Sequence, residues 1–165
     1  MAEKLCVFPG SFDPVTIGHL DLIERSARLF DEVVVAVLHN PAKEGRFPVA
    51  KRIELLSKAC AHIPNVRFEY FEGLLVEYMR SIGAKVVVRG LRNTKDFESE
   101  CQMAQLNRQM APEIETFFLA TDPAHAPVSS SAVREIGMFG GDFTPYVPAS
   151  IVADVAQVLK PDLER

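Results

Sequence analysis

Residues 8–19 combine residue types that can bind a phosphate group. Gly10 lets the backbone approach a ligand closely, and Ser11 next to it offers a hydroxyl. Gly18 and His19 stand at the expected start of a helix, where free N–H groups and the helix dipole favour anions. The same dipole disfavours the cationic form of His19, which in its neutral form still donates a hydrogen bond. The segment therefore predicts an anion-binding loop, although the chain contains neither a Walker lysine nor a GxGxxG pattern.

Basic side chains supply further candidate phosphate ligands. Lys43 follows an apolar run by a few residues, so its flexible ammonium can reach over the edge of a sheet. Arg89 and Arg92 suit bidentate phosphate contacts, and they lie in a stretch, residues 85–95, with four basic residues and no acidic one. The whole chain has a formal net charge of −4, which argues against nucleic acid as the main partner. The strip thus predicts a small anionic ligand, and a solvated charged face is the alternative.

Three consecutive hydroxyls, Ser129 to Ser131, open another expected helix. Capping of the helix explains one of them. Arg134 in the first turn opposes the helix dipole unless an anion lies nearby. This segment is therefore a further candidate phosphate-binding element.

Short β-branched runs alternate with stretches of helical spacing and place these groups at the ends of strands. Five strands are predicted, over residues 4–8, 32–39, 66–72, 85–89 and 114–120. Continuous apolar strands separated by helices indicate a parallel sheet covered on both faces. We therefore predict a Rossmann-like, doubly wound α/β fold, whose ligands bind beyond the carboxyl ends of the strands.

Composition narrows the class of protein. With 165 residues, 48% hydrophobic and 24% charged, the chain fits one globular domain over residues 1–165. The longest apolar run has six residues, 33–38, and residues 1–10 do not read as a signal peptide, so we expect a cytoplasmic protein without a membrane partner. Cys6, Cys60 and Cys101 are widely spaced, which predicts reduced core residues rather than disulfides or a zinc site.

Several linked motifs together resemble the bacterial phosphopantetheine adenylyltransferases, nucleotidyltransferases with an HxGH signature. The similarity extends over nearly the whole chain, and Thr16 stands at the first signature position, as is usual in this branch. Ser11 stands where Thr is common, and His125 where a larger aromatic residue is expected. The motifs are residues 9–14, 16–19, 89–92, 96–98 through 107–108, and 129–131.

The resemblance implies a nucleotidyltransferase-type fold and reversible transfer of the adenylyl group of ATP to 4′-phosphopantetheine, giving 3′-dephospho-coenzyme A and pyrophosphate. His19, Lys43 and Arg92 would be the catalytic residues, with His19 stabilising the transition state. By the same resemblance, phosphopantetheine would contact Ser11, Lys43, Leu75 and Arg89. ATP would contact Ser11, Phe12, His19, Gly90, Leu91, Arg92, Glu100, His125, Ala126, Pro127, Val128, Ser129, Ser130 and Ser131.

The reaction class and the resemblance also imply Mg²⁺, which would be held mainly by phosphates and water because no paired-carboxylate motif is visible. They imply a homohexamer and feedback inhibition by coenzyme A.

Two alternatives stay open from sequence. A sister enzyme would transfer CMP to a polyol phosphate or AMP to nicotinamide mononucleotide, but Thr16 and the motif from Arg89 to Arg92 weigh against it. A non-catalytic nucleotide sensor would not need His19, Lys43 and Arg92 together, because binding alone requires no groups directed at the leaving phosphates.

Overall fold

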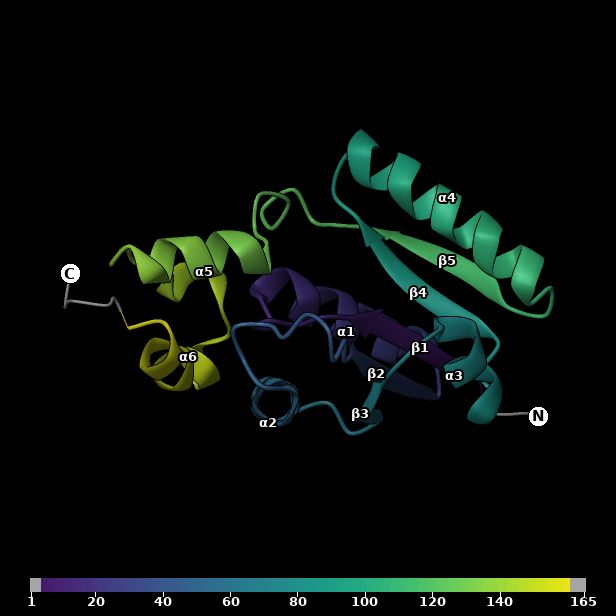
Figure 1. The fold of residues 1–165 in the computed structure, drawn as a ribbon, viewed down its shortest axis with the longest axis horizontal. Coiled ribbons are helices and arrows are strands. Elements are labelled where there is room, and N and C mark those ends of the chain that lie inside the picture. Colours follow the sequence, from purple (N-terminus) through teal and green to yellow (C-terminus); the bar gives the residue numbers. More distant parts are fainter. Residues whose placement is uncertain (1–3, 161–165) are drawn as a thin grey trace.

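The computed structural model describes residues 4–160 and contains a five-stranded, wholly parallel sheet (Figure 1). The strand order is β3-β2-β1-β4-β5, as expected for the doubly wound α/β fold that the sequence predicts. The strands are β1 (Leu5–Gly10), β2 (Glu32–Leu38), β3 (Val66–Phe71), β4 (Val86–Leu91) and β5 (Glu115–Ala120).

Two of the strands extend further than the apolar runs predict. β1 continues through Pro9 to Gly10, which is in register with Val37 of β2. β4 continues past Arg89, and its Gly90 is in register with Leu119 of β5. Pairing with a neighbouring strand fixes this backbone whatever the local composition, so part of the expected ligand loops is rigid sheet edge.

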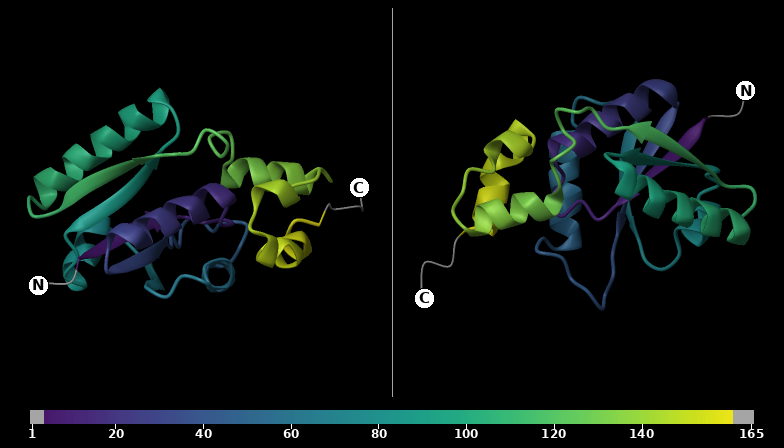
Figure 2. Two further views of the ribbon diagram at one scale, coloured as in Figure 1. Left: turned by 180° about the vertical axis from the view of Figure 1, so that it is seen from behind. Right: turned by 90° about the horizontal axis from the view of Figure 1, so that it is seen from above.

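Helices cover both faces of the sheet (Figure 2). One buried cluster joins alternate strand residues to α1, α2, α5 and α6, and a second joins the intervening strand residues to α3. α4 lies along β4 and β5 (Figure 1). The helices are α1 (Ile17–Leu29), α2 (Val49–Ala59), α3 (Leu75–Ser81), α4 (Thr94–Met110), α5 (Ser130–Met138) and α6 (Val152–Val158), with short 3-10 turns at Thr144–Tyr146 and Ala149–Ile151.

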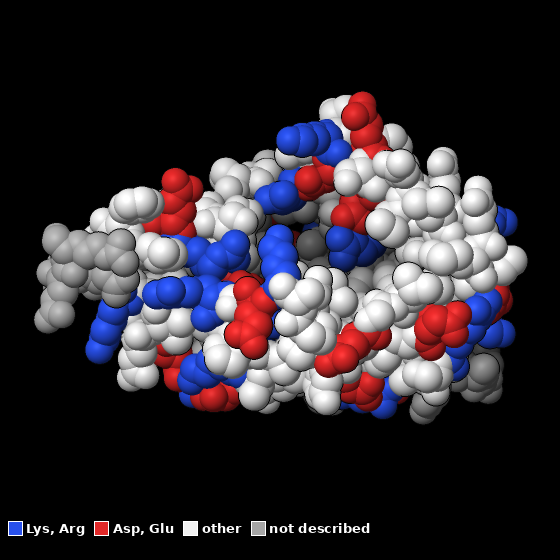
Figure 3. All heavy atoms as spheres, viewed as in Figure 1, with Lys and Arg blue, Asp and Glu red and all other residues white. Residues whose placement is uncertain are grey.

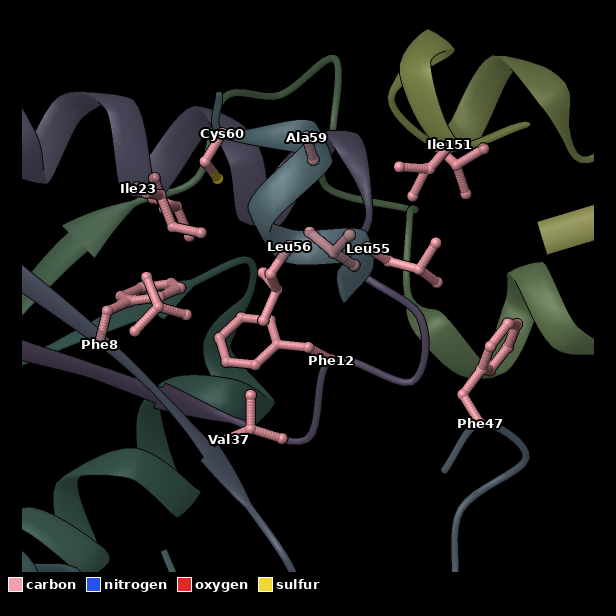
Figure 4. Close-up of a cluster of buried hydrophobic side chains, with 14 of the residues drawn as sticks. Phe8, Phe12, Ile23, Val37, Phe47, Leu55, Leu56, Ala59, Cys60 and Ile151 are labelled. Carbon is pink, nitrogen blue, oxygen red and sulfur yellow. The ribbon is translucent and has the colours of Figure 1, made fainter. Parts of the chain in front are cut away.

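The larger core cluster lies between the sheet, α2 and the C-terminal helices. Phe12 and Phe47, which come from two loops, are buried in it together with Leu56 of α2 (Figure 4). α5 and α6 lie beside each other at the end of the molecule opposite α3 (Figures 1 and 2). None of the helices in residues 4–160 has the length and apolar character needed to cross a bilayer.

The topology determines where a ligand site can form. Successive strands run outward from β1 on one side through β2 and β3, and the chain then crosses to β4 on the other side of β1. The connections after β1 and β4 therefore diverge to opposite faces and leave a crevice at their carboxyl ends. β1 ends at Gly10 and β4 ends at Leu91, so the two phosphate-compatible segments predicted from sequence meet at this crevice.

Candidate functional site

His19 is fixed at the start of α1 by a reciprocal pair of hydrogen bonds. Thr16 is the N-cap, and its hydroxyl oxygen accepts the backbone N–H of His19 at 3.3 Å. In return, the backbone N–H of Thr16 donates to His19 Nδ1 at 3.0 Å, which completes a capping box. Because Nδ1 is an acceptor, the neutral ring carries its proton on Nε2. The TxGH spacing thus places a histidine whose free ring nitrogen is a donor.

The surroundings of His19 keep its ring neutral. Burial, together with the positive charges of Arg89 and Arg92, lowers the pKa of His19 from 6.5 to about 4. The sequence predicts this direction from the helix dipole, and the structure adds burial, which has a larger effect than the two arginines. Near pH 7 the side chain is therefore an uncharged Nε2–H donor.

Phe12 lies behind His19. Its ring meets the imidazole edge-to-face with a centroid distance of 5.0 Å. Phe12 has a φ of +48°, which is uncommon for a residue with a side chain, and it is 2% exposed. Gly10 makes room for it, because a Cβ there would stand 3.1 Å from the Phe12 ring. A tightly packed, strained backbone thus supports the imidazole.

Arg89 is held by a carboxylate on α4. Its Nε and Nη2 donate to the two oxygens of Glu100 at 2.8 and 2.6 Å, and its Nη1 donates to the Pro9 carbonyl at 2.8 Å. This bidentate arrangement fixes the plane of the guanidinium. These bonds use three of the five N–H groups of Arg89 and leave two for a ligand.

Arg92 has a similar partner one turn into α4. Its Nε donates to Asp96 Oδ2 at 2.9 Å, and its Nη1 donates to the Val128 carbonyl at 3.4 Å. The stretch 85–95 contains no acidic residue, so its charge appears unbalanced in sequence. The carboxylates that orient both arginines come from the helix that follows.

The three serines at the start of α5 have different partners. Ser129 is the N-cap, and its Oγ accepts the backbone N–H of Ala132 at 3.1 Å. Ser130 Oγ donates to the Pro14 carbonyl at 2.7 Å and so ties α5 to the loop after β1. Ser131 Oγ accepts from Arg134 at 3.3 Å. Ser129 and Ser130 line the crevice, so the start of α5 borders it, as an anion-binding helix start requires.

Two adjoining cavities occupy the crevice, and the hollow bordered by charged side chains in Figure 3 lies on this face. The first, of about 260 Å³, has a polar lining that includes His19, Arg92 and Ser129. The second, of about 460 Å³, runs between α4 and the sheet and is lined largely by apolar side chains, among them Leu75 and Met103. The cavities share Pro9, Gly10, Ser11, Arg89 and Glu100.

The structure places most of the sequence-predicted residues on these walls. The first cavity is lined by Ser11, His19, Arg89, Gly90, Arg92, Glu100, His125, Val128, Ser129 and Ser130, and the second by Ser11, Leu75, Arg89 and Glu100. Six predicted residues line neither: Phe12, Lys43, Leu91, Ala126, Pro127 and Ser131. Phe12 is buried behind His19, and Lys43 is exposed on the loop after β2.

Several wall residues have no site role in the sequence-based prediction, although Thr16, Asp96 and Asn107 lie within its motifs. Thr16, Asp96 and Thr121 line the first cavity, while Met103 and Asn107 line the second. The wall of the second cavity could have been predicted from helical spacing. Ser99, Met103 and Asn107 recur every four residues along α4, so they share one face of the helix.

Buried polar atoms that lack a hydrogen-bond partner lie at the first cavity. Among the described side chains, the fully buried polar atoms without a hydrogen-bond partner are Thr121 Oγ1 and His125 Nδ1, and both residues line that cavity. Residues 4–160 contain no group of three or more His, Cys, Asp or Glu side chains that could hold a metal ion. Asp96 and Glu100 are occupied by arginines, so the protein walls fit a phosphorylated ligand better than a dedicated metal cage.

Comparison with known proteins agrees with this geometry. The sequence pattern of the cytidylyltransferase-like family matches residues 7–136. A phosphopantetheine adenylyltransferase of Heliobacterium modesticaldum is 49% identical over 153 residues, which cover 93% of this chain and 91% of that protein. One from Thermosynechococcus vestitus is 52% identical over 151 residues, with 92% and 90% coverage.

A solved structure shares the fold at low sequence identity. The nicotinic acid mononucleotide adenylyltransferase of Plasmodium falciparum, solved with NaAD, superposes with a TM-score of 0.66 at 12% identity and covers 96% of this chain and 95% of that one. This likeness establishes the nucleotidyltransferase-type fold, and the closer relatives establish the family. On these grounds the chain belongs to the phosphopantetheine adenylyltransferases, a group within the cytidylyltransferase-like family.

Proposed function

We propose that the protein reversibly transfers the adenylyl group of ATP to 4′-phosphopantetheine, giving 3′-dephospho-coenzyme A and pyrophosphate. The observation that carries the proposal is the meeting of a polar and an apolar cavity at Ser11, Arg89 and Glu100. A reaction that joins a nucleotide to a phosphate on a long, weakly polar arm needs two such compartments with the reacting phosphates at their junction.

The nucleotide belongs in the polar cavity. The start of α1 and the start of α5 present free N–H groups there, and Arg92 adds a fixed cation. Thr121 and His125, whose polar atoms lack partners, lie in the loop that would face the base. The triphosphate would bring Mg²⁺ with it as part of the nucleotide substrate, held by phosphate oxygens and water, because the walls offer no carboxylate free for the ion.

The acceptor arm belongs in the apolar cavity. Leu75 and Met103 would cover the methyl-bearing part of pantetheine, and Asn107, which is 6% exposed, places an amide where the arm's own amides need partners. The terminal phosphate of the arm would then reach Arg89, whose two remaining N–H groups face the shared wall. Lys43, on the exposed loop after β2, would reach the same phosphate from outside the walls.

The chemistry needs no covalent enzyme intermediate. An oxygen of the acceptor phosphate attacks the α-phosphorus of ATP, a new P–O bond forms, and the bond to the pyrophosphate oxygen breaks with its electron pair. Charge builds up on the oxygens around the α-phosphorus during the transfer. The Nε2–H of His19 is a donor whose proton, ring plane and protonation state are fixed in advance, so it stabilises that charge without reorganisation.

Further properties follow from the family and are part of the proposal. Coenzyme A carries both the adenylyl and pantetheine parts of the product, so it would occupy both cavities and inhibit. Assembly into a homohexamer is supported by large apolar side chains exposed outside the two cavities on α4 and β5, namely Phe97, Leu106 and Phe117. A cytoplasmic location agrees with the three cysteines, all free thiols. Neither nucleic acid nor membrane is expected as a partner.

An acceptor panel tests the proposal. The purified protein is offered ATP or CTP with 4′-phosphopantetheine, nicotinamide mononucleotide or a polyol phosphate, and pyrophosphate release is followed. We expect release only with ATP and phosphopantetheine. Release with nicotinamide mononucleotide or with CTP would assign the chain to a sister activity on the same fold. Tight ATP binding without any pyrophosphate exchange would favour a nucleotide sensor.

A further inference from the structure

Arg52 of α2 is a buried cation that faces neither cavity. Its side chain is 4% exposed, and its guanidinium donates to three backbone carbonyls. Nε donates to Phe47 O at 3.0 Å, and Nη1 donates to Ser11 O at 2.9 Å and to Leu38 O at 3.2 Å.

The three carbonyls belong to two functional segments. Ser11 lies in the loop after β1 that lines both cavities. Leu38 ends β2, and Phe47 precedes α2, so they are the two ends of the loop that carries Lys43. One planar guanidinium therefore joins both ends of the Lys43 loop to each other and to the phosphate-facing loop.

Asp13 makes a second connection between the loop after β1 and the Phe47 end of the Lys43 loop. Its carboxylate accepts the backbone N–H of Arg46 at 2.9 Å and of Phe47 at 2.8 Å. Gly45 packs directly on this carboxylate, since a Cβ at that position would stand 2.5 Å from Asp13 Oδ2. Phe47 itself is fully buried in the core (Figure 4). The Phe47 end of the loop is thus fixed, while residues 42–44, which include Lys43, are exposed at its tip.

Packing of α2 alone does not require this charge. No carboxylate in residues 4–160 forms an ion pair with Arg52, so its partners are the three carbonyls and the more distant charge of Asp13. A buried cation without a direct ion pair is expensive compared with an apolar side chain of similar volume. Arg52 instead fixes the geometry, because no apolar side chain could hydrogen-bond to three carbonyls and hold them at fixed distances.

We propose that Arg52 is a positioning residue, which sets the place of Lys43 relative to Ser11 by fixing the base of the loop between β2 and α2. The inference rests on the proposed adenylyl transfer, in which these two residues would flank the acceptor phosphate. Arg52 touches neither substrate, so its effect passes through Lys43. Displacement of a reacting group by about 1 Å from a remote change costs up to about 100-fold in rate.

A double-variant cycle tests the inference. Arg52→Lys keeps the charge but cannot reach all three carbonyls, and we expect kcat to fall by about 10- to 100-fold. Lys43→Ala removes the ammonium group that Arg52 positions under this proposal. If Arg52 acts through Lys43, the double variant is no more than about twofold slower than Lys43→Ala alone, whereas independent sites multiply their losses.

Ala59→Gly is the matched control. It lies in the last turn of the same helix, is buried, and weakens α2 without touching the loop base. We expect it to lower Tm while leaving kcat within about twofold of the unchanged protein. If Arg52→Lys does not fold, Asp13→Asn enters the same cycle, because it keeps the size of the side chain but removes its charge.

The outcomes separate the two proposals. An unchanged protein that releases no pyrophosphate with phosphopantetheine refutes the proposed function itself. An active protein in which Arg52→Lys retains full kcat overturns the positioning role, and so does a double variant whose loss is the product of the single losses. If Ala59→Gly loses as much kcat as Arg52→Lys, Arg52 contributes to stability and not to positioning.

Discussion

Replacement of His19 by alanine separates two roles that one side chain plays. The imidazole accepts the Thr16 backbone N–H through Nδ1 at 3.0 Å, and it offers Nε2–H to the cavity. Loss of the capping interaction costs about 0.5–2 kcal/mol of stability. Loss of one transition-state donor costs about 10²–10³ in kcat, or about 3–4 kcal/mol of activation free energy. We therefore expect a folded His19→Ala protein that binds ATP but turns over at least about 100-fold more slowly.

Thr16→Ala is the comparison that assigns these costs. It removes the hydroxyl that caps the His19 N–H at 3.3 Å and lies 3.2 Å from His19 Nδ1, but it keeps the backbone N–H that donates to Nδ1 at 3.0 Å and orients the imidazole. Both variants should lose similar stability in thermal or denaturant unfolding. Pyrophosphate release in steady state, with ATP binding measured by calorimetry, then gives the catalytic part. If Thr16→Ala loses as much kcat as His19→Ala, the loss stems from the helix start and the Nε2 donor has no special role.

Four other predictions concern protonation, charge and close packing. Burial lowers the pKa of His19 to about 4, so the neutral Nε2–H donor persists above pH 6. The pH profile of kcat should therefore show no ionisation near pH 6.5 and should fall only toward pH 4. An ionisation near pH 6.5 that disappears in His19→Ala would contradict this. The same shift disfavours the folded state as pH falls from 6.5 to 4, so urea unfolding should show wild-type stability dropping there more than that of His19→Ala. Arg89→Lys cannot reproduce the bidentate bonds to Glu100 at 2.8 and 2.6 Å, so KM for phosphopantetheine should rise about 10- to 100-fold while KM for ATP changes less; equal changes in both would contradict the assignment. Gly45→Ala would place a methyl group 2.5 Å from Asp13 Oδ2, so the free energy of unfolding should fall by about 1–3 kcal/mol in chemical denaturation. An unchanged denaturation midpoint would show that the base of the loop moves to accommodate the methyl group.

The fold was predictable because its signals are local. Buried parallel strands must be apolar on both faces, and the run from Val33 to Val37, which is fully buried, has that character in sequence. All five predicted strands are confirmed, with boundaries that shift by one or two residues. The strands extend to Gly10 and Leu91 because these residues pair with neighbouring strands, and this pairing cannot be seen in the local sequence.

The chemistry of the site was predictable where residue type and position coincide. His19 at a helix start and Arg89 near a strand end are such cases, and both line the first cavity. The contacts that position the site were not predictable. The resemblance makes Glu100 an ATP contact but does not show that its two oxygens hold Arg89, and Asp13 and Arg52, which fix the loop that carries Lys43, have no positioning role in the sequence-based prediction. Their burial and partners depend on contacts between segments 11 to 41 residues apart, which only the folded chain brings together.

The direct measurement of the central claim is product formation from ATP and 4′-phosphopantetheine, with pantetheine lacking its phosphate as the control. Mass spectrometry follows dephospho-coenzyme A while a coupled assay follows pyrophosphate. We expect the two products in a one-to-one ratio with phosphopantetheine and neither with pantetheine, because the acceptor phosphate supplies the nucleophile. Equal pyrophosphate release with both acceptors, or pyrophosphate without dephospho-coenzyme A, would contradict adenylyl transfer at the junction of the two cavities.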